Sequence, residues 1–416
     1  MSDVDKLAFT LAYYSGDRKT GSVAIVDGQA GKIEVIQVKT LGESGSEAGL
    51  KPIFIGITPD HNMVTLDPKH KTIAHNSRFV SDAFPAHIYS DPTSDRAWFM
   101  NDGDKESGND TLNCGDQGSS VTVIEQPNSA EARYLKTICV GRGHHQASFT
   151  YPAPTAPSVP HTVYISNLKD GTLSAIGNDP ARAEDYLKVV ATINLCEADK
   201  EEGMCEPTVP NNAFPHGLAY SPLSGKVYNL NNGYGTIAVV DPLTYTIEER
   251  IPFKGHSNLF LSPCGRYIIG RGADRKSDPH HVIAKLSVFD VVSKRIVAKL
   301  DIPDIYISKY YFNPEGTKLY LTTSSSGSPE QLAHLKTDAL LIFDLMQLPE
   351  LKLRQELRLG SSPGSLEFLT CAGKTERLFS ANAQTGSLMV LDGESDQVID
   401  EIKVAVSQEH ARIWLI

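Results

Sequence analysis

One short pattern recurs seven times along this chain of 416 residues: a run of alternating apolar residues that usually ends in an acidic residue. Alternation over about four to eight residues is typical of a β-strand. The seven copies are Ser22–Asp27, Ser120–Glu125, Thr172–Ile176, Thr236–Asp241, Leu286–Asp290, Leu340–Asp344 and Ser387–Asp392. The later copies lie roughly 48 to 64 residues apart, a spacing typical of repeated units that pack against their neighbours. The pattern therefore favours a repeat architecture built from strands.

Each copy belongs to a unit of four strands, here called A to D. A strand with an aromatic residue, and often an Asn, precedes the copies, as in Trp98–Asn101 and Val227–Asn231. Before it comes an apolar strand closed by a tight turn, such as Ser262–Gly265 or Asn313–Gly316, where Pro and Gly supply the turn geometry. Such units arranged radially form a propeller. We predict an all-β chain that forms one seven-bladed β-propeller domain over residues 1–416.

The two ends of the chain complement each other. Glu409–Ile416 has the pattern of a strand A with nothing after it, and Lys6–Val38 supplies strands B, C and D without an A. We expect these termini to combine in one blade, which closes the ring and removes open sheet edges. A β-sandwich array would not explain complementary ends. Residues 50–86 could form an eighth, degenerate blade, but we expect an insertion over 39–86 on the top face.

A resemblance to a known family rests on residues 215–241, which read PHGLAYSP, then KVYNLNN, then GTIAVVD. This stretch resembles the YVTN-repeat propellers, relatives of the cytochrome cd1 haem domain, the nitrous oxide reductase propeller and the lactonase-type propellers. The resemblance covers most blades. It implies a ring of blades with a site on its top face, and it implies no particular chemistry.

Composition excludes some partners and leaves the compartment open. The net charge of −11 argues against nucleic acid or an anionic membrane as the main partner. No apolar run is long enough for a transmembrane helix, and the N-terminal residues resemble no signal peptide. The chain is cytoplasmic as written, or periplasmic if Met1 begins a mature exported chain. We expect a small-molecule substrate, and the oligomeric state is open.

The six cysteines form no CxxC pair, so a thiolate zinc site is not expected. Cys196 and Cys205 flank one polar loop. They could form a disulfide, which would imply an oxidising compartment, or remain two reduced thiols. Cys264 and Cys371 are expected to be free thiols in exposed turns.

Histidines recur where strand A begins, near the expected mouth of the central channel. These residues are His87, His144, His145, His216, His256 and His410. Three or four converging imidazoles can fill the coordination shell of copper or zinc. The nitrous oxide reductase propeller, which our sequence resembles, holds its copper cluster with blade histidines. The sequence therefore predicts copper, with zinc as second choice. A metal-free histidine-lined pocket and purely structural histidines are the alternatives.

The predicted function is a metal-dependent oxidoreductase that acts on a small molecule at the top of the channel. Glu409 beside His410 could act as a general base, and Lys309 could supply positive charge to a bound anion. The first alternative is a metal-free, lactonase-like hydrolase, in which a His or Glu activates water and Lys309 or Arg142 stabilises an oxyanion. The second is a metallochaperone or interaction scaffold without turnover.

Overall fold

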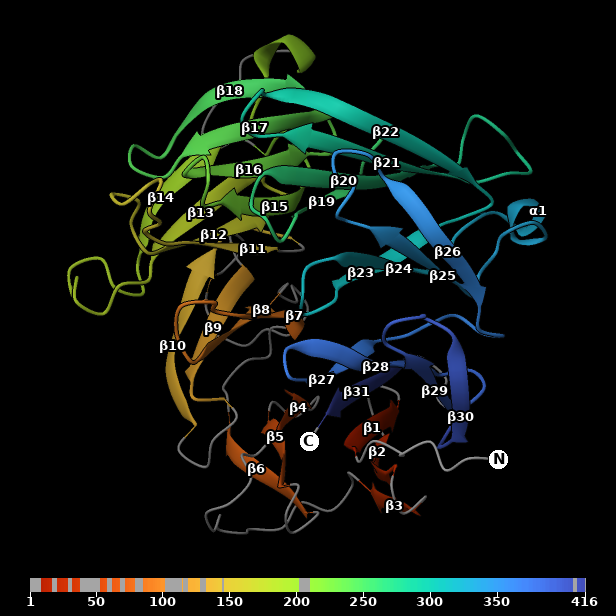
Figure 1. Cartoon of the computed structure of the whole chain (residues 1–416). Helices are drawn as coiled ribbons and strands as arrows, with labels where there is room; N and C mark the ends of the chain where they lie inside the picture. Colours follow the sequence, from red (N-terminus) through yellow and green to blue (C-terminus); the bar gives the residue numbers. More distant parts are fainter. Residues whose placement is uncertain are drawn as a thin grey trace.

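The protein is described here by a computed structural model, and almost all of its regular structure is β (Figure 1). The structure describes residues 9–16, 21–28, 32–37, 53–57, 62–67, 72–78, 85–101, 114, 119–127, 132–143, 146–201, 210–406 and 410–415. Within these ranges the helical elements are α1 (Pro329–Leu332) and a 3-10 turn at Ala198–Lys200. This part of the chain contains no helix with the length and hydrophobicity needed to span a lipid bilayer.

The strands form seven four-stranded antiparallel sheets, as the repeats predict. The first contains β1 (Thr10–Gly16), β2 (Gly21–Asp27), β3 (Lys32–Gln37) and β31 (His410–Leu415); the second contains β7 (Pro85–Ser90), β8 (Arg96–Asn101), β9 (Ser119–Glu125) and β10 (Arg133–Val140). The third contains β11 (Ala147–Thr150), β12 (Thr162–Asn167), β13 (Thr172–Gly177) and β14 (Val189–Asn194); the fourth contains β15 (Pro215–Ser221), β16 (Lys226–Asn231), β17 (Thr236–Asp241) and β18 (Thr246–Pro252).

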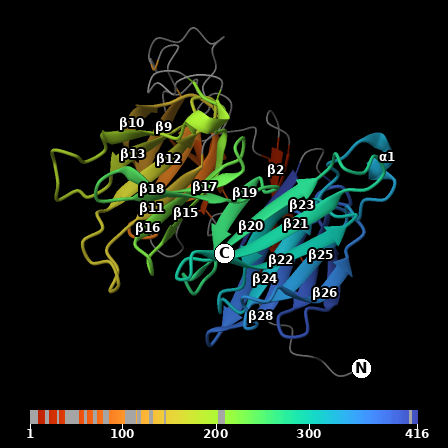
Figure 2. The same cartoon turned by 90° about the horizontal axis from the view of Figure 1, so that it is seen from above.

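The C-terminal half continues the same order. The fifth sheet contains β19 (Asn258–Leu261), β20 (Tyr267–Asp274), β21 (Ile283–Asp290) and β22 (Arg295–Pro303). The sixth contains β23 (Ile307–Phe312), β24 (Lys318–Thr323), β25 (Ala339–Asp344) and β26 (Lys352–Arg358); the seventh contains β27 (Leu366–Cys371), β28 (Lys374–Asn382), β29 (Ser387–Asp392) and β30 (Val398–Lys403). The sheets follow one another around a centre (Figure 1), and the view from above places β11–β18 and β20–β28 on opposite sides (Figure 2). This arrangement is consistent with a seven-bladed propeller.

The C-terminal strand completes the N-terminal sheet. β31 pairs antiparallel with β1, from Leu11 opposite Leu415 to Gly16 opposite His410. The prediction that the two ends of the chain share one blade is therefore confirmed. This pairing ties the first residues to the last, so the inner edge of the N-terminal sheet is not left exposed.

The core lies between successive sheets rather than inside one layer. Six clusters of buried apolar side chains each combine residues of two neighbouring sheets, from the second and third to the seventh and first. Trp98 of the second sheet, for example, meets Phe149 of the third edge-on, with ring centroids 6.0 Å apart. Strands β8, β12, β13 and β24 are buried at every position. Along these strands, alternate residues therefore face one neighbouring sheet or the other, because solvent reaches neither face.

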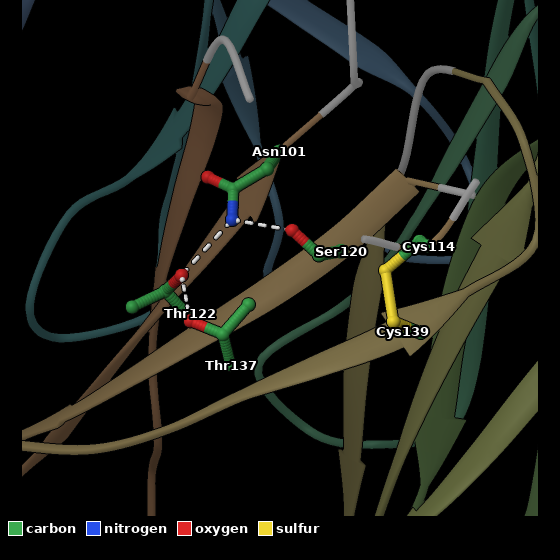
Figure 3. Close-up of a disulfide and its surroundings, with 6 residues drawn as sticks. All are labelled: Asn101, Cys114, Ser120, Thr122, Thr137 and Cys139. Carbon is green, nitrogen blue, oxygen red and sulfur yellow. Dashed lines mark hydrogen bonds between the residues drawn. A yellow bond between two sulfur atoms is a disulfide. The ribbon is translucent and has the colours of Figure 1, made fainter. Parts of the chain in front are cut away.

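Buried Asn residues at the ends of the second strands have a structural role (Figure 3). The Asn101 amide donates hydrogen bonds of 3.0 Å to the hydroxyls of Ser120 and Thr122 on the next strand. Asn167 makes the same pair of bonds in the third sheet, to Thr172 and Ser174. A buried amide costs free energy unless it is hydrogen-bonded, so the recurrent Asn and the hydroxyls opposite it form one unit.

Two further features bear on the predictions from the sequence. Residues 53–78 carry a three-stranded sheet of β4 (Ile53–Ile57), β5 (Asn62–Asp67) and β6 (Thr72–Arg78), which stands between the first and second sheets in Figure 1. The single domain and the 39–86 insertion on the top face stay predictions. A disulfide joins Cys114 to Cys139 (Figure 3), and the sequence did not indicate it. Cys196 is also disulfide-bonded, whereas Cys205 lies outside the described residues. Cys264 and Cys371 are free and exposed, as expected.

Candidate functional site

The innermost strand of each four-stranded sheet surrounds the centre of the molecule (Figure 1). Three consecutive sheets place a charged side chain within the first three residues of this strand: Lys309 on β23, Glu367 on β27 and Arg412 on β31. The strand registers place Glu367 level with Tyr311 of β23, whereas Lys309 and Arg412 lie about two residues nearer the start of their strands. We call Lys309, Glu367, Arg412 and the neighbouring Tyr311 the channel cluster.

Lys309 occupies an irregular part of its strand. The register of β23 against β24 shifts between Ile307 and Tyr310, and the Lys309 amide donates to the Thr322 hydroxyl at 3.2 Å. The side chain remains accessible to solvent. Surrounding protein nevertheless lowers the pKa of its amine, chiefly by desolvation and further through the charge of Arg412. A residue in the wall of an internal channel has this combination of surrounding protein and access to solvent.

Glu367 has the most altered acidity of the cluster. Burial raises the pKa of its carboxyl to about 7, although a hydrogen bond with the Phe368 backbone acts in the opposite direction. Burial also raises the pKa of Tyr311 to about 12; there the charge of Glu367 adds to the rise and that of Arg412 opposes it. Tyr311 is therefore within electrostatic reach of both, and Arg412 is also within reach of Lys309. These interactions connect the four side chains across three sheets.

Arg271, on β20 of the fifth sheet, is a further cationic side chain that contacts the sixth sheet. Its guanidinium donates to the Ile307 carbonyl at 2.9 Å, while its buried Nε has no hydrogen-bond partner among the described residues. Desolvation lowers its pKa, and the groups that act on its charge are Tyr306 and Tyr310. The Tyr310 ring stacks on Phe260 of the fifth sheet, with centroids 3.9 Å apart and an interplanar angle of 11°.

The channel cluster combines an acid–base group with positive charge. A carboxyl group with a pKa of about 7 is half ionised at neutral pH, which suits it to take up and return a proton. Cationic side chains nearby can stabilise a developing oxyanion. The sequence pointed to Lys309 but not to Glu367 or Arg412. The only sign was a single acid within the apolar run Leu366–Leu369, and the burial that alters its pKa depends on the neighbouring sheets.

The predicted histidines occupy different surroundings. The Nδ1 of His216 lies 2.6 Å from the Ser257 carbonyl, which joins the fourth sheet to the fifth. His256 is 7% exposed and stacks on Phe253, with centroids 4.2 Å apart. Desolvation lowers its pKa to about 4. A Cβ at Gly272 would lie 2.6 Å from the Cα of His256, so glycine is what lets this segment approach β20.

The structure describes only some of the other residues predicted for the site. His87 lies half-buried with its ring edge-on to Tyr89 at 6.3 Å. The side chain of Arg142 is paired with Asp170, Nε to Oδ1 at 2.7 Å. His144, His145 and Glu409 lie outside the described residues, as does the side chain of His410, whose backbone opens β31. Their predicted roles stay predictions.

Comparisons with known proteins support the fold. No protein family matches the sequence, and no curated protein matches it. Among solved structures, the chain is similar to the periplasmic gluconolactonase PpgL of Pseudomonas aeruginosa, with a TM-score of 0.57, 13% identity and coverage of 98% of this chain and 99% of that one. It is also similar to the dihydro-heme d1 dehydrogenase NirN, with a TM-score of 0.60, 12% identity and coverage of 97% and 74%.

A third similar structure is a protein from Bacteroides uniformis that is provisionally assigned as a 6-phosphogluconolactonase. Its TM-score is 0.52 at 14% identity, with coverage of 88% of this chain and 99% of that one. At these identities the likenesses show the fold alone, and they support a β-propeller. Membership of the YVTN family in particular is not shown, because no family matches.

The prediction of a metal-dependent oxidoreductase is wrong. In the described part of the chain, no three His, Cys, Asp or Glu side chains are grouped so that they could hold a metal ion. Proteins described as lactonases are among the similar structures, at identities that show the fold alone. Of the predicted ligands, His256 is buried and packs on Phe253, whereas His144, His145 and the side chain of His410 lie outside the described residues. Whether the chain binds copper or zinc stays untested.

Proposed function

We propose that this chain is a metal-free, lactonase-type hydrolase whose site is the channel cluster. The observation that carries the proposal is the position of Glu367, a carboxyl group with a pKa of about 7 on the innermost strand, between the strands that carry Lys309 and Arg412. Hydrolysis of a lactone needs a base for water and a counter-charge for the oxyanion. The lactonases among the similar folds support the same class of reaction.

The reaction follows from these groups. The Glu367 carboxylate takes a proton from a water molecule as the water oxygen attacks the lactone carbonyl carbon. The carbonyl oxygen becomes an oxyanion, which Lys309 and Arg412 stabilise. When this intermediate collapses, the ring C–O bond breaks, and Glu367 returns its proton to the alkoxide that leaves. The product is a hydroxy acid, and the base is regenerated.

The test is hydrolysis of five- and six-membered lactones by the full chain, followed by titration of the released acid and corrected for spontaneous opening. We expect turnover by the parent protein and a loss of about 100-fold or more in kcat/KM for Glu367→Gln, because general base catalysis contributes about that much. Glu394→Gln, in an exposed turn after β29, is the matched control. A parent protein that opens no lactone, or a Glu367→Gln variant as active as the control, would refute the proposal.

We also infer that the seven four-stranded sheets close into one ring, with the β4–β6 sheet between the first and second sheets. Six apolar clusters that join successive sheets support this closure. Truncation before His410 removes β31 and should abolish cooperative unfolding of the whole chain. A truncated chain that unfolds with the parent midpoint would contradict the closed ring.

A further inference from the structure

A hollow on the fifth sheet is lined by residues that do not belong to the channel cluster. Its volume is about 240 Å³, and its lining residues are Gly255, Ala273, Asp274, Arg275, Lys276 and Lys285. The hollow is small beside the pockets that hold drug-sized ligands, so it suits a small group rather than a whole cofactor.

The lining is strongly cationic in an acidic protein. Three basic side chains and one acidic side chain leave a net charge of +2 in the hollow, whereas the whole chain carries −11. Like charges placed together repel one another unless a counter-ion joins them. The excess of positive charge in this hollow therefore favours binding of an anion.

The one carboxylate of the lining is already engaged. Asp274 accepts hydrogen bonds from the Lys276 amide at 3.1 Å and from the Ser277 amide and hydroxyl at 3.0 and 2.7 Å. These bonds, with that of the Ser277 hydroxyl the largest cause, lower its pKa. Its Oδ2 lies 3.6 Å from the Lys285 amine. Asp274 therefore holds its own turn and offsets part of one of the three positive charges.

The other two cations are held without a carboxylate partner among the described residues. Arg275 donates to the Ser326 hydroxyl at 3.1 Å, and its guanidinium lies 5.6 Å from the centroid of the Tyr306 ring. Both contacts orient the guanidinium and leave its charge uncompensated. Lys276 is exposed at the rim, and its amine has no partner in the described part of the chain.

We propose that this hollow, lined by Arg275, Lys276 and Lys285, is a binding site for a phosphate group. A phosphate group carries a charge of about −1.5 to −2 near pH 7, which matches the excess of +2 in the lining. Its oxygens accept charge-assisted hydrogen bonds from guanidinium and ammonium groups. A singly charged carboxylate would leave part of that excess uncompensated.

The experiment is isothermal titration of the full chain with inorganic phosphate at pH 7.5, with chloride used to keep the ionic strength constant. We expect saturable binding to one site. Lys276→Met and Arg275→Met should each weaken it about ten-fold or more, which is the range for loss of one charge-assisted bond. Lys276→Arg should keep it, and Lys352→Met, an exposed lysine on β26, should leave it unchanged. Circular dichroism establishes that each variant is folded.

Several outcomes would overturn the proposal. These are no phosphate binding, binding that Lys276→Met and Arg275→Met leave unchanged, and acetate binding as tight as phosphate binding. The site does not depend on the proposed hydrolase, so Glu367→Gln should bind phosphate as the parent does. Loss of lactone hydrolysis with phosphate binding intact would separate the two proposals.

Discussion

The stability of the Glu367→Gln variant should depend on pH in a way that follows directly from the position of Glu367. Burial raises the pKa of this carboxyl from 4.5 to about 7. The folded protein therefore binds this proton more tightly than the unfolded chain does. The stabilisation from the bound proton is complete below about pH 4.5 and is lost as the pH rises through 7. At pH 8 the folded protein holds a buried carboxylate at a cost.

The size of that cost follows from the two pKa values. The difference between 4.5 and about 7 corresponds to about 3 kcal/mol. Solvent reaches part of the side chain and screens its charge, so we expect about 2 kcal/mol. A neutral glutamine of nearly the same shape avoids this cost. Glu367→Gln should therefore be more stable than the parent at pH 8 by about 2 kcal/mol and equally stable at pH 4.

Urea-induced unfolding of both proteins at pH 4 and pH 8, followed by circular dichroism, measures this difference. Glu394→Gln provides the control, because its side chain is exposed in a turn and should change stability at neither pH. Equal stability of the parent and Glu367→Gln at pH 8 would show that Glu367 is not desolvated. Glu367 would then not be suited to act as a base near neutral pH.

Three other predictions concern the rest of the molecule. Asp396→Ala should lower the free energy of unfolding by about 3 to 5 kcal/mol, because it leaves the Lys318 amine, which lies 2.8 Å from the fully buried Asp396, without its carboxylate partner. Urea unfolding measures this, and a loss below about 1 kcal/mol would contradict it. Removing the Cys114–Cys139 disulfide by Cys114→Ser should cost about 2 to 4 kcal/mol in the same assay. Cys371→Ser, at a free and exposed cysteine, is the control, and an unchanged midpoint for Cys114→Ser is the contrary result. The pKa of His256 is lowered to about 4, so the unfolded chain takes up this proton first as the pH falls from 6.5, and stability declines toward pH 4. His256→Phe, which can keep the stack on Phe253, should reduce that decline in urea unfolding. An identical decline would show that another group causes it.

The sequence was informative about the fold because a propeller is a repeat. Alternating strands such as Thr236–Asp241 recur, the later copies roughly 48 to 64 residues apart, and the structure forms one sheet around each copy. The incomplete termini predicted the pairing of β31 with β1. The β4–β6 sheet could not be assigned, because its strands lack the sequence features that mark the other sheets. The Cys114–Cys139 disulfide was missed for a related reason, since two distant loop and strand positions meet only in the folded sheet.

The site was harder to predict because its chemistry depends on packing between sheets. Histidines at the starts of the innermost strands predict a common point of convergence, which stays a prediction because His144, His145 and the side chain of His410 lie outside the described residues. The contacts of His216 with the Ser257 carbonyl and of His256 with Phe253 depend on neighbouring sheets and cannot be predicted from the strand pattern. The altered acidity of Glu367 comes from desolvation, which no local pattern encodes. Lys309, which the sequence pattern places in a position similar to the histidines, is the one member of the proposed cluster that the sequence predicted.

The role of Glu367 as the base is best tested by the pH dependence of kcat/KM for lactone hydrolysis by protein treated with EDTA and dialysed into metal-free buffer. The base must be ionised, so kcat/KM should be level above the Glu367 pKa of about 7 and fall about ten-fold for each pH unit below it. Chelation should leave the rate unchanged. Activity that disappears on chelation and returns with copper or zinc would contradict the account, as would a rate that is level down to pH 5.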